Sequence, residues 1–452
     1  MSEFMSILIQ GGLIIDPSQD YCQEGDLLIE EGKILALDRP GQIPCTRASQ
    51  VIQAQGKWVV PGLIDAHVHL REPGLEYKET IATGTRAARA GGFTSVACMA
   101  NTQPVNDNAY VTAFIREKAK ATASCRVFPV GAVTKGLKGE ELAEIGGMIE
   151  AGAQAISDDG MPVMNSYLMR KAMDYAKAFG VAVISHAEDA NLVGQGVMNE
   201  SALSNELGLR GNPAAAEEIL VAREIALCRL TGARVHLAHI SSKVALEHIV
   251  RAKEAGLPVT AEASPHHLIL TEETLRSFQT NFKMAPPLRT EEDVEALQKA
   301  VSEKWIDLIA TDHAPHGITE KAVEFDQAAF GIIGLQTAVP LTLKLVEQGI
   351  LSPLRWVECL SMNPARLLNL PYGTLQKGRE ADITLIHPEW EWKFTADQIL
   401  SKSQNTPFLD WNLKGAAIAT LVGGKLLDHS PPPRRNHSEL LRGFYSVETS
   451  KR

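Results

Sequence analysis

The sequence predicts an α/β fold, a TIM-like (β/α)8 barrel with a small β domain built from both chain termini. Three observations support this prediction. Short apolar runs alternate with longer helical patterns through the middle of the chain. The two ends contain strand-like segments and turns punctuated by glycine. Metal-type side chains follow several of the apolar runs, at the end of the strands where such a barrel carries its active site.

The middle of the chain, residues 61–370, contains eight apolar runs that we expect to form parallel strands. They are 62–68, 93–99, 126–132, 153–157, 181–185, 234–239, 258–263 and 306–310. Each run but the last precedes a stretch with a helical pattern, such as 76–91, 139–151, 165–179, 213–231 and 242–255. Parallel strands joined by right-handed helical crossovers over about 300 residues predict a closed barrel.

The two ends of the chain have a different pattern. SILIQGGLIID and GDLLIEEGKILALD lie near the N-terminus, and ADITLIH and IATLVGGKLL lie near the C-terminus. We expect one small β domain, with its N-terminal part at 1–60 and its C-terminal part at 371–429. The tail at 430–452, which contains PPPRR, is expected to be an extended or poorly ordered arm.

Composition and charge narrow the class of protein. The chain has 452 residues, of which 45% are hydrophobic and 22% charged, as in ordinary globular proteins. A net charge of −10 without a Lys/Arg block argues against nucleic acid or an anionic membrane as a partner. No apolar run approaches the ~20 residues of a membrane span, and the start lacks a basic region, so we expect a cytoplasmic protein. The 6 cysteines lack CxxC spacing and are expected to be reduced thiols.

The pair His67 and His69 in PGLIDAHVHLR is the most informative feature of the chain. Histidines two apart on a strand point to the same face and can bind one metal ion together. An isolated HxH is more often a pair of packed histidines, but here four other apolar runs end in metal-type residues. The metal-type residues at the ends of these four runs are Asp158, Asp159, His186, His239, Asp312, His313 and His316. Imidazole and carboxylate ligands suit zinc, so we expect a metal site at the C-terminal ends of the strands.

Several segments resemble those of the class I dihydroorotases in the amidohydrolase superfamily, over residues 60 to about 425. They are DAHVHLREPG, NTQPV, SDDG, SHAED, AHISS, PHHL, PPLR, ATDHAPH, FGIIGLQT and NTPFLDWNLKG. The resemblance implies a hydrolase that reversibly opens the cyclic amide of (S)-dihydroorotate to N-carbamoyl-L-aspartate in pyrimidine (UMP) biosynthesis. It also implies a binuclear centre with two zinc ions per chain, or other divalent metals in their place.

The resemblance further implies a role for each ligand. His67, His69 and Asp312 would hold one ion, and His186 and His239 the other. Strand alternation alone leaves the choice between Asp158 and Asp159 open, whereas alignment to the family motif makes Asp159 the bridge. Asp312 is also the implied catalytic residue, a base that accepts the proton of the attacking water and delivers it to the leaving nitrogen.

Other residues are implied to bind the substrate or to support the ligands. The implied substrate contacts are Arg71, Asn101, His316, Phe330 and Gly331. A guanidinium at Arg71 would lie on the face of His69 if the strand continues, and could hold a carboxylate through two hydrogen bonds. Asp65, His266 and His267 are expected to support the ligands. Residues 317–331 are expected to form a lid over the substrate.

Two positions bear on the substrate and on the alternatives. Hydantoinases and allantoinases characteristically bridge their metals with a carbamylated lysine, where this chain has SDDG. Class I dihydroorotases commonly carry Asn before the two prolines of KMAPPLR, where this chain has Ala285. SDDG favours a dihydroorotase, whereas Ala285 leaves another cyclic-amide hydrolase, an allantoinase or a hydantoinase, as the alternative function. A scaffold for aspartate transcarbamoylase is the other alternative, although all six ligand positions are filled. A homo-oligomer and association with that enzyme are the expected partners besides the small-molecule substrate.

Overall fold

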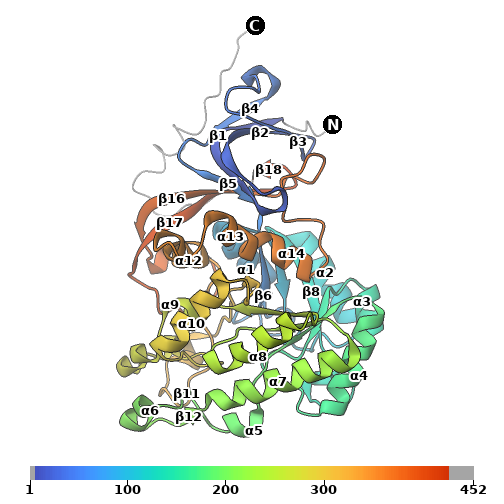
Figure 1. Ribbon diagram of the computed structural model, residues 1–452, viewed down its shortest axis with the longest axis vertical. Coiled ribbons are helices and arrows are strands. Elements are labelled where there is room, and N and C mark those ends of the chain that lie inside the picture. Colours follow the sequence, from blue (N-terminus) through green and yellow to red (C-terminus); the bar gives the residue numbers. More distant parts are fainter. Residues whose placement is uncertain (1–5, 427–452) are drawn as a thin grey trace.

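The computed structural model describes residues 6–426, whose strands form a barrel sheet, a terminal sheet and a small two-stranded sheet (Figure 1). The barrel strands run in the order in which they occur in the chain, and all their pairings are parallel. They are β6 (Leu63–Val68), β7 (Phe93–Cys98), β8 (Arg126–Gly131), β9 (Ala155–Ser157), β10 (Ala182–Ser185), β13 (Val235–Leu237), β14 (Val259–Ala263) and β15 (Leu308–Ile309).

The chain after β15 closes the barrel against β6. Val68 and His313 form a parallel bridge, and the His69 amide donates a 2.9 Å hydrogen bond to the His313 carbonyl. The predicted barrel is confirmed, and each predicted strand overlaps an observed one.

Helices cover the outside of the barrel (Figure 1). They are α1 (Ile81–Ala90), α2 (Ala109–Thr122), α3 (Ile145–Glu150), α4 (Ser166–Ala178), α7 (Ala214–Thr231), α8 (Lys243–Glu254), α10 (Glu291–Ser302) and α12 (Ala338–Glu347). Side-chain caps fix several of their first turns. Asn108 accepts hydrogen bonds from the amides of Tyr110 and Val111, and Thr290 forms a capping box with Asp293.

Two helices begin later than the sequence pattern predicts. The predicted helix 76–91 starts at Ile81, where Thr80 forms a capping box with Thr83. The predicted helix 139–151 is shortened to Ile145–Glu150, and Gly139 before it has a φ of +69°. In both cases the residues ahead of the helix belong to a loop at the C-terminal end of the barrel.

Short elements elaborate that end and the opposite end of the barrel. They are α5 (Ala190–Val193), β11 (Met198–Asn199), α6 (Ala202–Leu207), β12 (Gly211–Asn212), α9 (Pro265–Ile269), α11 (Ile318–Lys321), α13 (Pro353–Val357) and α14 (Asn363–Leu367). Alternate residues of the barrel strands fill the interior, among them Ile64, Ala97, Ala155 and Ile184. Leu367 packs against the same cluster. The interior is therefore a solid floor beneath the polar end of the barrel.

The terminal sheet combines both ends of the described chain. Its order is β18-β17-β16-β5-β1-β2-β3, with β4 paired to β1. The strands are β1 (Ile7–Asp16), β2 (Tyr21–Glu30), β3 (Lys33–Asp38), β4 (Gln50–Gln53), β5 (Trp58–Pro61), β16 (Ile383–Lys393), β17 (Asn412–Val422) and β18 (Lys425–Leu426). β5 pairs antiparallel with β16, so the predicted β domain from both termini is confirmed. The boundaries at 60 and 370 stay a prediction, and the predicted tail at 430–452 lies outside the described residues.

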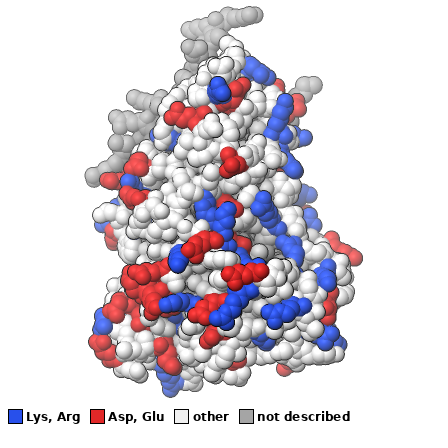
Figure 2. All heavy atoms as spheres, viewed as in Figure 1, with Lys and Arg blue, Asp and Glu red and all other residues white. Residues whose placement is uncertain are grey.

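The surface carries both signs of charge. Lys and Arg side chains lie interspersed with Asp and Glu over the barrel helices on the face seen in Figure 2. Within residues 6–426, no helix is both long enough and apolar enough to cross a membrane.

Candidate active site

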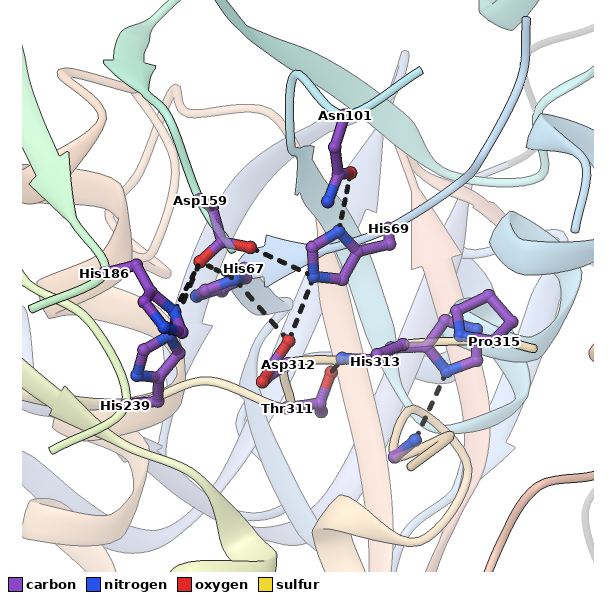
Figure 3. Close-up of polar contacts among 12 residues, drawn as sticks. His67, His69, Asn101, Asp159, His186, His239, Thr311, Asp312, His313 and Pro315 are labelled. Carbon is purple, nitrogen blue, oxygen red and sulfur yellow. Dashed lines mark hydrogen bonds and ion pairs between the residues drawn. The ribbon is translucent and has the colours of Figure 1, made fainter. Parts of the chain in front are cut away.

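Six buried side chains predicted to bind metal meet at the C-terminal ends of the barrel strands (Figure 3). They are His67, His69, Asp159, His186, His239 and Asp312. They extend from β6, β9, β10, β13 and β15 or from the residues just after these strands. The fold therefore brings together ligands that are spread over about 245 residues of sequence.

Asp159 lies at the centre of this group (Figure 3). Its Oδ1 is 3.3 Å from His67 Nε2, 3.4 Å from His239 Nε2 and 3.6 Å from His186 Nδ1. Its Oδ2 is 3.4 Å from His69 Nε2. One carboxylate thus contacts four histidines, which is the arrangement expected of a ligand shared by two ions.

Strand alternation explains why Asp159, and not Asp158, faces the site. Ala155 in β9 belongs to the interior cluster, and the same alternation reaches Asp159 four residues later. Asp158 points the other way and accepts hydrogen bonds from the amides of Val133 (2.7 Å) and Thr134 (3.0 Å). Burial raises the pKa of Asp158 to about 6.

Asp312 completes the group on the side of His69. Its Oδ1 lies 3.0 Å from His69 Nε2 and 3.6 Å from His67 Nε2. Two sets of three residues are close enough to hold a metal ion together, one with His67, Asp159 and His239, the other with His67, His69 and Asp312. His67 thus belongs to both sets. His186 belongs to neither set, but its Nδ1 lies 2.9 Å from His239 Nε2.

The donor set fits a divalent metal. His67 Nε2 is buried and has no hydrogen-bond partner within residues 6–426, although it faces two carboxylates. A buried polar atom without a partner is costly, and a metal ion would satisfy it. Four imidazoles and two carboxylates are the mixed nitrogen and oxygen ligands that zinc accepts.

The outward nitrogens of three histidines are held by other side chains. His67 Nδ1 lies 2.7 Å from Glu262 Oε1, His69 Nδ1 lies 2.9 Å from Asn101 Oδ1, and His186 Nε2 lies 3.0 Å from Glu188 Oε2. Such contacts orient a metal-binding imidazole and favour the tautomer that leaves its inner nitrogen free. Sequence reasoning missed Glu262 and Glu188, although a charged residue within the buried run VTAEA is an unusual signal.

Neighbouring histidines stabilise the ionised form of the carboxyl groups in the site. Burial alone would raise the pKa of Asp159, but the charge of His67 and the neighbouring imidazoles of His186 and His239 hold that pKa well below its ordinary value. Burial also opposes ionisation of Glu262, yet His67 and His236 keep the pKa of this carboxyl below its ordinary value. Both groups are therefore anionic near neutral pH and suited to a cationic environment.

Arg71 reaches the site by a different route from the one predicted. The expectation that it continues the strand face of His69 was wrong, because β6 ends at Val68 and Arg71 has a φ of +61°. Its side chain is buried, with Nη2 3.5 Å from His316 Nε2 and Nε donating to the Pro315 carbonyl at 3.3 Å. Burial, together with Arg71 and Lys78, lowers the pKa of His316 to about 3, so a neutral imidazole lies beside the guanidinium.

The remaining predicted residues lie around this centre. The side chain of Asn101 contacts His69 through its amide oxygen, which leaves its NH2 group as a donor. Asp65 accepts hydrogen bonds from the amides of His67 and Thr311, both at 3.1 Å. His267 Nε2 contacts the Pro286 carbonyl at 3.0 Å, and His313 Nε2 lies 3.3 Å from Glu79. These last contacts support the structure around the ligands.

A cavity of about 960 Å³ opens beside the metal-type residues. His186, Glu188, Ala285 and Phe330 are among the residues that line it. Gly331 follows with a φ of +150°, and a Cβ there would lie 2.6 Å from the Ala314 carbonyl oxygen. The close approach explains why this position requires glycine.

Comparisons with known proteins point to one family. A family model described as dihydro-orotase-like matches residues 56–245. The dihydroorotase of Geobacter metallireducens is 52% identical over 423 residues, which cover 94% of this chain and 99% of the relative. The dihydroorotase of Geobacter sulfurreducens is 53% identical over 423 residues, again 94% of this chain and 99% of the relative.

Solved structures with the same fold include two hydantoinases. The L-hydantoinase (dihydropyrimidinase) of Arthrobacter aurescens superimposes with a TM-score of 0.86 at 25% identity, over 94% of this chain and 97% of that one. The D-hydantoinase of a Thermus species gives a TM-score of 0.78 at 26% identity, over 93% and 94%. The fold therefore extends over nearly the whole described chain.

Proposed function

The chain belongs to the dihydroorotase family, and from that premise we propose that it catalyses the reversible hydrolysis of (S)-dihydroorotate to N-carbamoyl-L-aspartate, a step of de novo pyrimidine (UMP) biosynthesis. It is a metal-dependent cyclic amidohydrolase that acts on a small molecule. The observation that carries the proposal is the carboxylate of Asp159 among four histidines.

We propose two zinc ions as the metals of this site. His67, His69 and Asp312 would hold one ion, His186 and His239 the other, and Asp159 both. When bound, such ions supply a water that ionises near neutral pH and polarise the scissile carbonyl. The mutual distances of 3.0 to 3.6 Å between these carboxylate oxygens and ring nitrogens support the proposal.

Asp312 is the proposed general base and acid. Its Oδ1 faces His69 and His67, whereas its Oδ2 makes no hydrogen bond within residues 6–426 and can exchange a proton. Asp312 would accept the proton of the attacking water and donate it to the ring nitrogen as the amide bond breaks. In the reverse direction the same oxygen removes a proton from the carbamoyl nitrogen.

Arg71 and His316 are proposed to bind the substrate carboxylate. The guanidinium and the imidazole lie side by side, and a carboxylate between them would accept from the guanidinium and, in the tautomer that carries its proton on Nε2, from His316. Asn101 would add its NH2 group, and Phe330 and Gly331 would contact the ring. A local cationic site of this kind is needed because the protein as a whole has a net charge of −10.

Turnover of competing rings tests the substrate assignment. We expect the purified, metal-loaded protein to hydrolyse dihydroorotate with a higher kcat/KM than hydantoin or allantoin. Hydantoinase activity is the second candidate, because Ala285 replaces the usual Asn in the cavity wall and hydantoinases share the fold. A clear preference for hydantoin or allantoin would contradict the dihydroorotase assignment.

Two partners belong to the proposal through the family. A homo-oligomer and association with aspartate transcarbamoylase can be measured by sedimentation velocity, with this protein alone and mixed with that enzyme. Sedimentation of this protein as a monomer in both samples would contradict the homo-oligomer and the association with aspartate transcarbamoylase.

A further inference from the structure

The segment from His316 to Gly331, called here the wall segment, carries three of the proposed substrate contacts. α11 occupies only Ile318–Lys321 of it, and the rest is irregular. Phe330 lines the cavity, and Gly331 packs against His316. Whatever fixes the wall segment therefore fixes one side of the substrate site.

Two buried lysines hold the wall segment by its main-chain carbonyls. Lys283 Nζ donates to the carbonyls of Phe325 (2.8 Å) and Asp326 (2.9 Å). Lys321 Nζ donates to the carbonyls of Ala329 (2.8 Å) and Gly331 (3.1 Å). The four bonds are short and all end on the last seven residues of the segment.

Gly331 is held at both its amide and its carbonyl. Its N–H donates to the Lys283 carbonyl at 2.9 Å, and its carbonyl accepts from Lys321 and, at 3.0 Å, from the side-chain amide of Asn405. Lys283 Nζ also lies 4.4 Å from the centre of the Phe330 ring. Both lysines thus contact the Phe330–Gly331 pair directly.

These two lysines are unusual because no carboxylate forms an ion pair with either one within residues 6–426. The side chains are only 2% (Lys283) and 6% (Lys321) exposed. Burial, opposed by Asp326, lowers the pKa of Lys283 to about 8, and burial together with Lys283 lowers the pKa of Lys321 to about 7. A buried cation without a counter-ion destabilises the fold, so a function is the simplest reason for keeping two of them.

We propose that Lys283 and Lys321 are positioning residues that clamp the wall segment and so keep Phe330 and Gly331 in place for the substrate. A lid movement of residues 317–331, as expected from the sequence, would have to break the two hydrogen bonds from Lys283, whereas Lys321 lies within the segment and braces it internally through its own two. The positioning role rests on the proposed function, whereas the clamp itself does not.

The test compares Lys321→Met and Lys283→Met with the wild type. Methionine has a similar length but no donor, so the carbonyls lose their partners. At pH 6, where both lysines carry a proton, we expect hydrogen exchange in residues 322–331 of the metal-loaded protein to accelerate roughly 10- to 100-fold, as for the loss of one hydrogen bond to a charged group. KM for dihydroorotate should rise by a similar factor. Metal content should stay the same and kcat should change less, since Asp312 and the ligands are untouched.

Lys177→Met is the matched control. Lys177 also donates to a backbone carbonyl, that of Thr231 at 2.7 Å, but it links α4 to α7 on the outside of the barrel. This variant should leave KM and exchange in 322–331 unchanged. Lys321→Gln keeps an uncharged donor and provides a second variant if the methionine variants do not fold.

Three results would overturn the proposal. Fast exchange of residues 322–331 in the wild type would show that no clamp exists. Unchanged exchange in either lysine variant would show that the ammonium groups do not hold the segment. Faster exchange with an unaltered KM would show that the clamp does not position the substrate. A wild type without dihydroorotase activity would contradict the proposed function and the positioning role. Because hydrogen exchange is measured without substrate, it would still show whether the lysines hold the wall segment.

Discussion

Replacement of Asp159 by asparagine should separate the two neighbouring aspartates of SDDG. Asp159 has oxygens 3.3 to 3.6 Å from ring nitrogens of four histidines, so an ion bound by these nitrogens lies close to the carboxylate. The change to asparagine keeps the shape of the side chain and removes one negative charge. Metal content and activity should therefore fall together.

The size of the loss follows from Coulomb's law. At about 4 Å and an effective dielectric constant of about 20, one pair of unit charges contributes about 4 kcal/mol. One factor of ten in affinity corresponds to about 1.4 kcal/mol, so the affinity for a divalent ion should fall by about a thousandfold or more.

Competition of each protein with a zinc-binding dye measures this affinity, and Asp158→Asn is the matched control. Asp158 bonds to the amides of Val133 and Thr134 and faces away from the histidines. Its asparagine variant should lose some stability and keep wild-type metal affinity. Reversed behaviour of the two variants would refute the assignment of Asp159 as the shared ligand.

Four further changes test other parts of the site. Glu262→Gln removes a carboxylate 2.7 Å from His67 Nδ1 and should weaken zinc binding about 10- to 100-fold in the same dye assay, which wild-type affinity would contradict. Ala285→Asn adds an amide to the cavity wall and should raise kcat/KM for dihydroorotate roughly 2- to 12-fold, the effect of one neutral hydrogen bond; an unchanged value would show that the ring does not reach this wall. Gly331→Ala places a Cβ 2.8 Å from His316 Cδ2 and should raise KM for dihydroorotate at unchanged zinc content, whereas a wild-type KM would count against His316 as a substrate contact. Burial and Lys283 lower the pKa of Lys321 from 10.5 to about 7, so between these pH values the unfolded chain binds a proton that the folded chain lacks. The free energy of unfolding, measured with urea, should therefore increase more for the wild type than for Lys321→Met as the pH rises from 7 towards 10.5. The same pH dependence in both proteins would contradict this prediction.

The barrel strands could be predicted because burial on both faces leaves a local signal. Runs such as 181–185 and 258–263 overlap β10 and β14 closely, since apolar runs between turns are typical of parallel strands. The start of α1 could not be predicted in the same way. Glu79 lies within the helical pattern, but its carboxylate accepts hydrogen bonds from the backbone amide of Lys402, more than 300 residues away. Contacts between loops far apart in sequence override the local periodicity there.

The candidate ligands could be predicted because metal chemistry restricts the residue types. His67, His69 and Asp312 each lie at or just after the end of a predicted strand, and the structure brings them together. Their supporting contacts could not be predicted. Glu262 reaches His67 across 195 residues of sequence, and the two lysines of the clamp contact carbonyls, which every residue possesses.

His239 and Arg71 show the limit of strand alternation. His239 has a φ of +33° and Arg71 a φ of +61°, so both side chains reach the site from the backbone just past a strand end. Alternation therefore predicts which residues face the barrel interior along a strand, as for Ala155 and Ser157 in β9, and is not reliable where the strand becomes a loop.

Titration of the metal-free protein with zinc, followed by dihydroorotate turnover, tests the binuclear site most directly. A centre in which Asp159 joins two histidine pairs predicts that activity rises with added zinc and reaches a plateau at two ions per chain. Chelation should then abolish that activity. A plateau at one ion per chain, or full turnover of dihydroorotate after prolonged chelation with no zinc bound, would contradict the binuclear site.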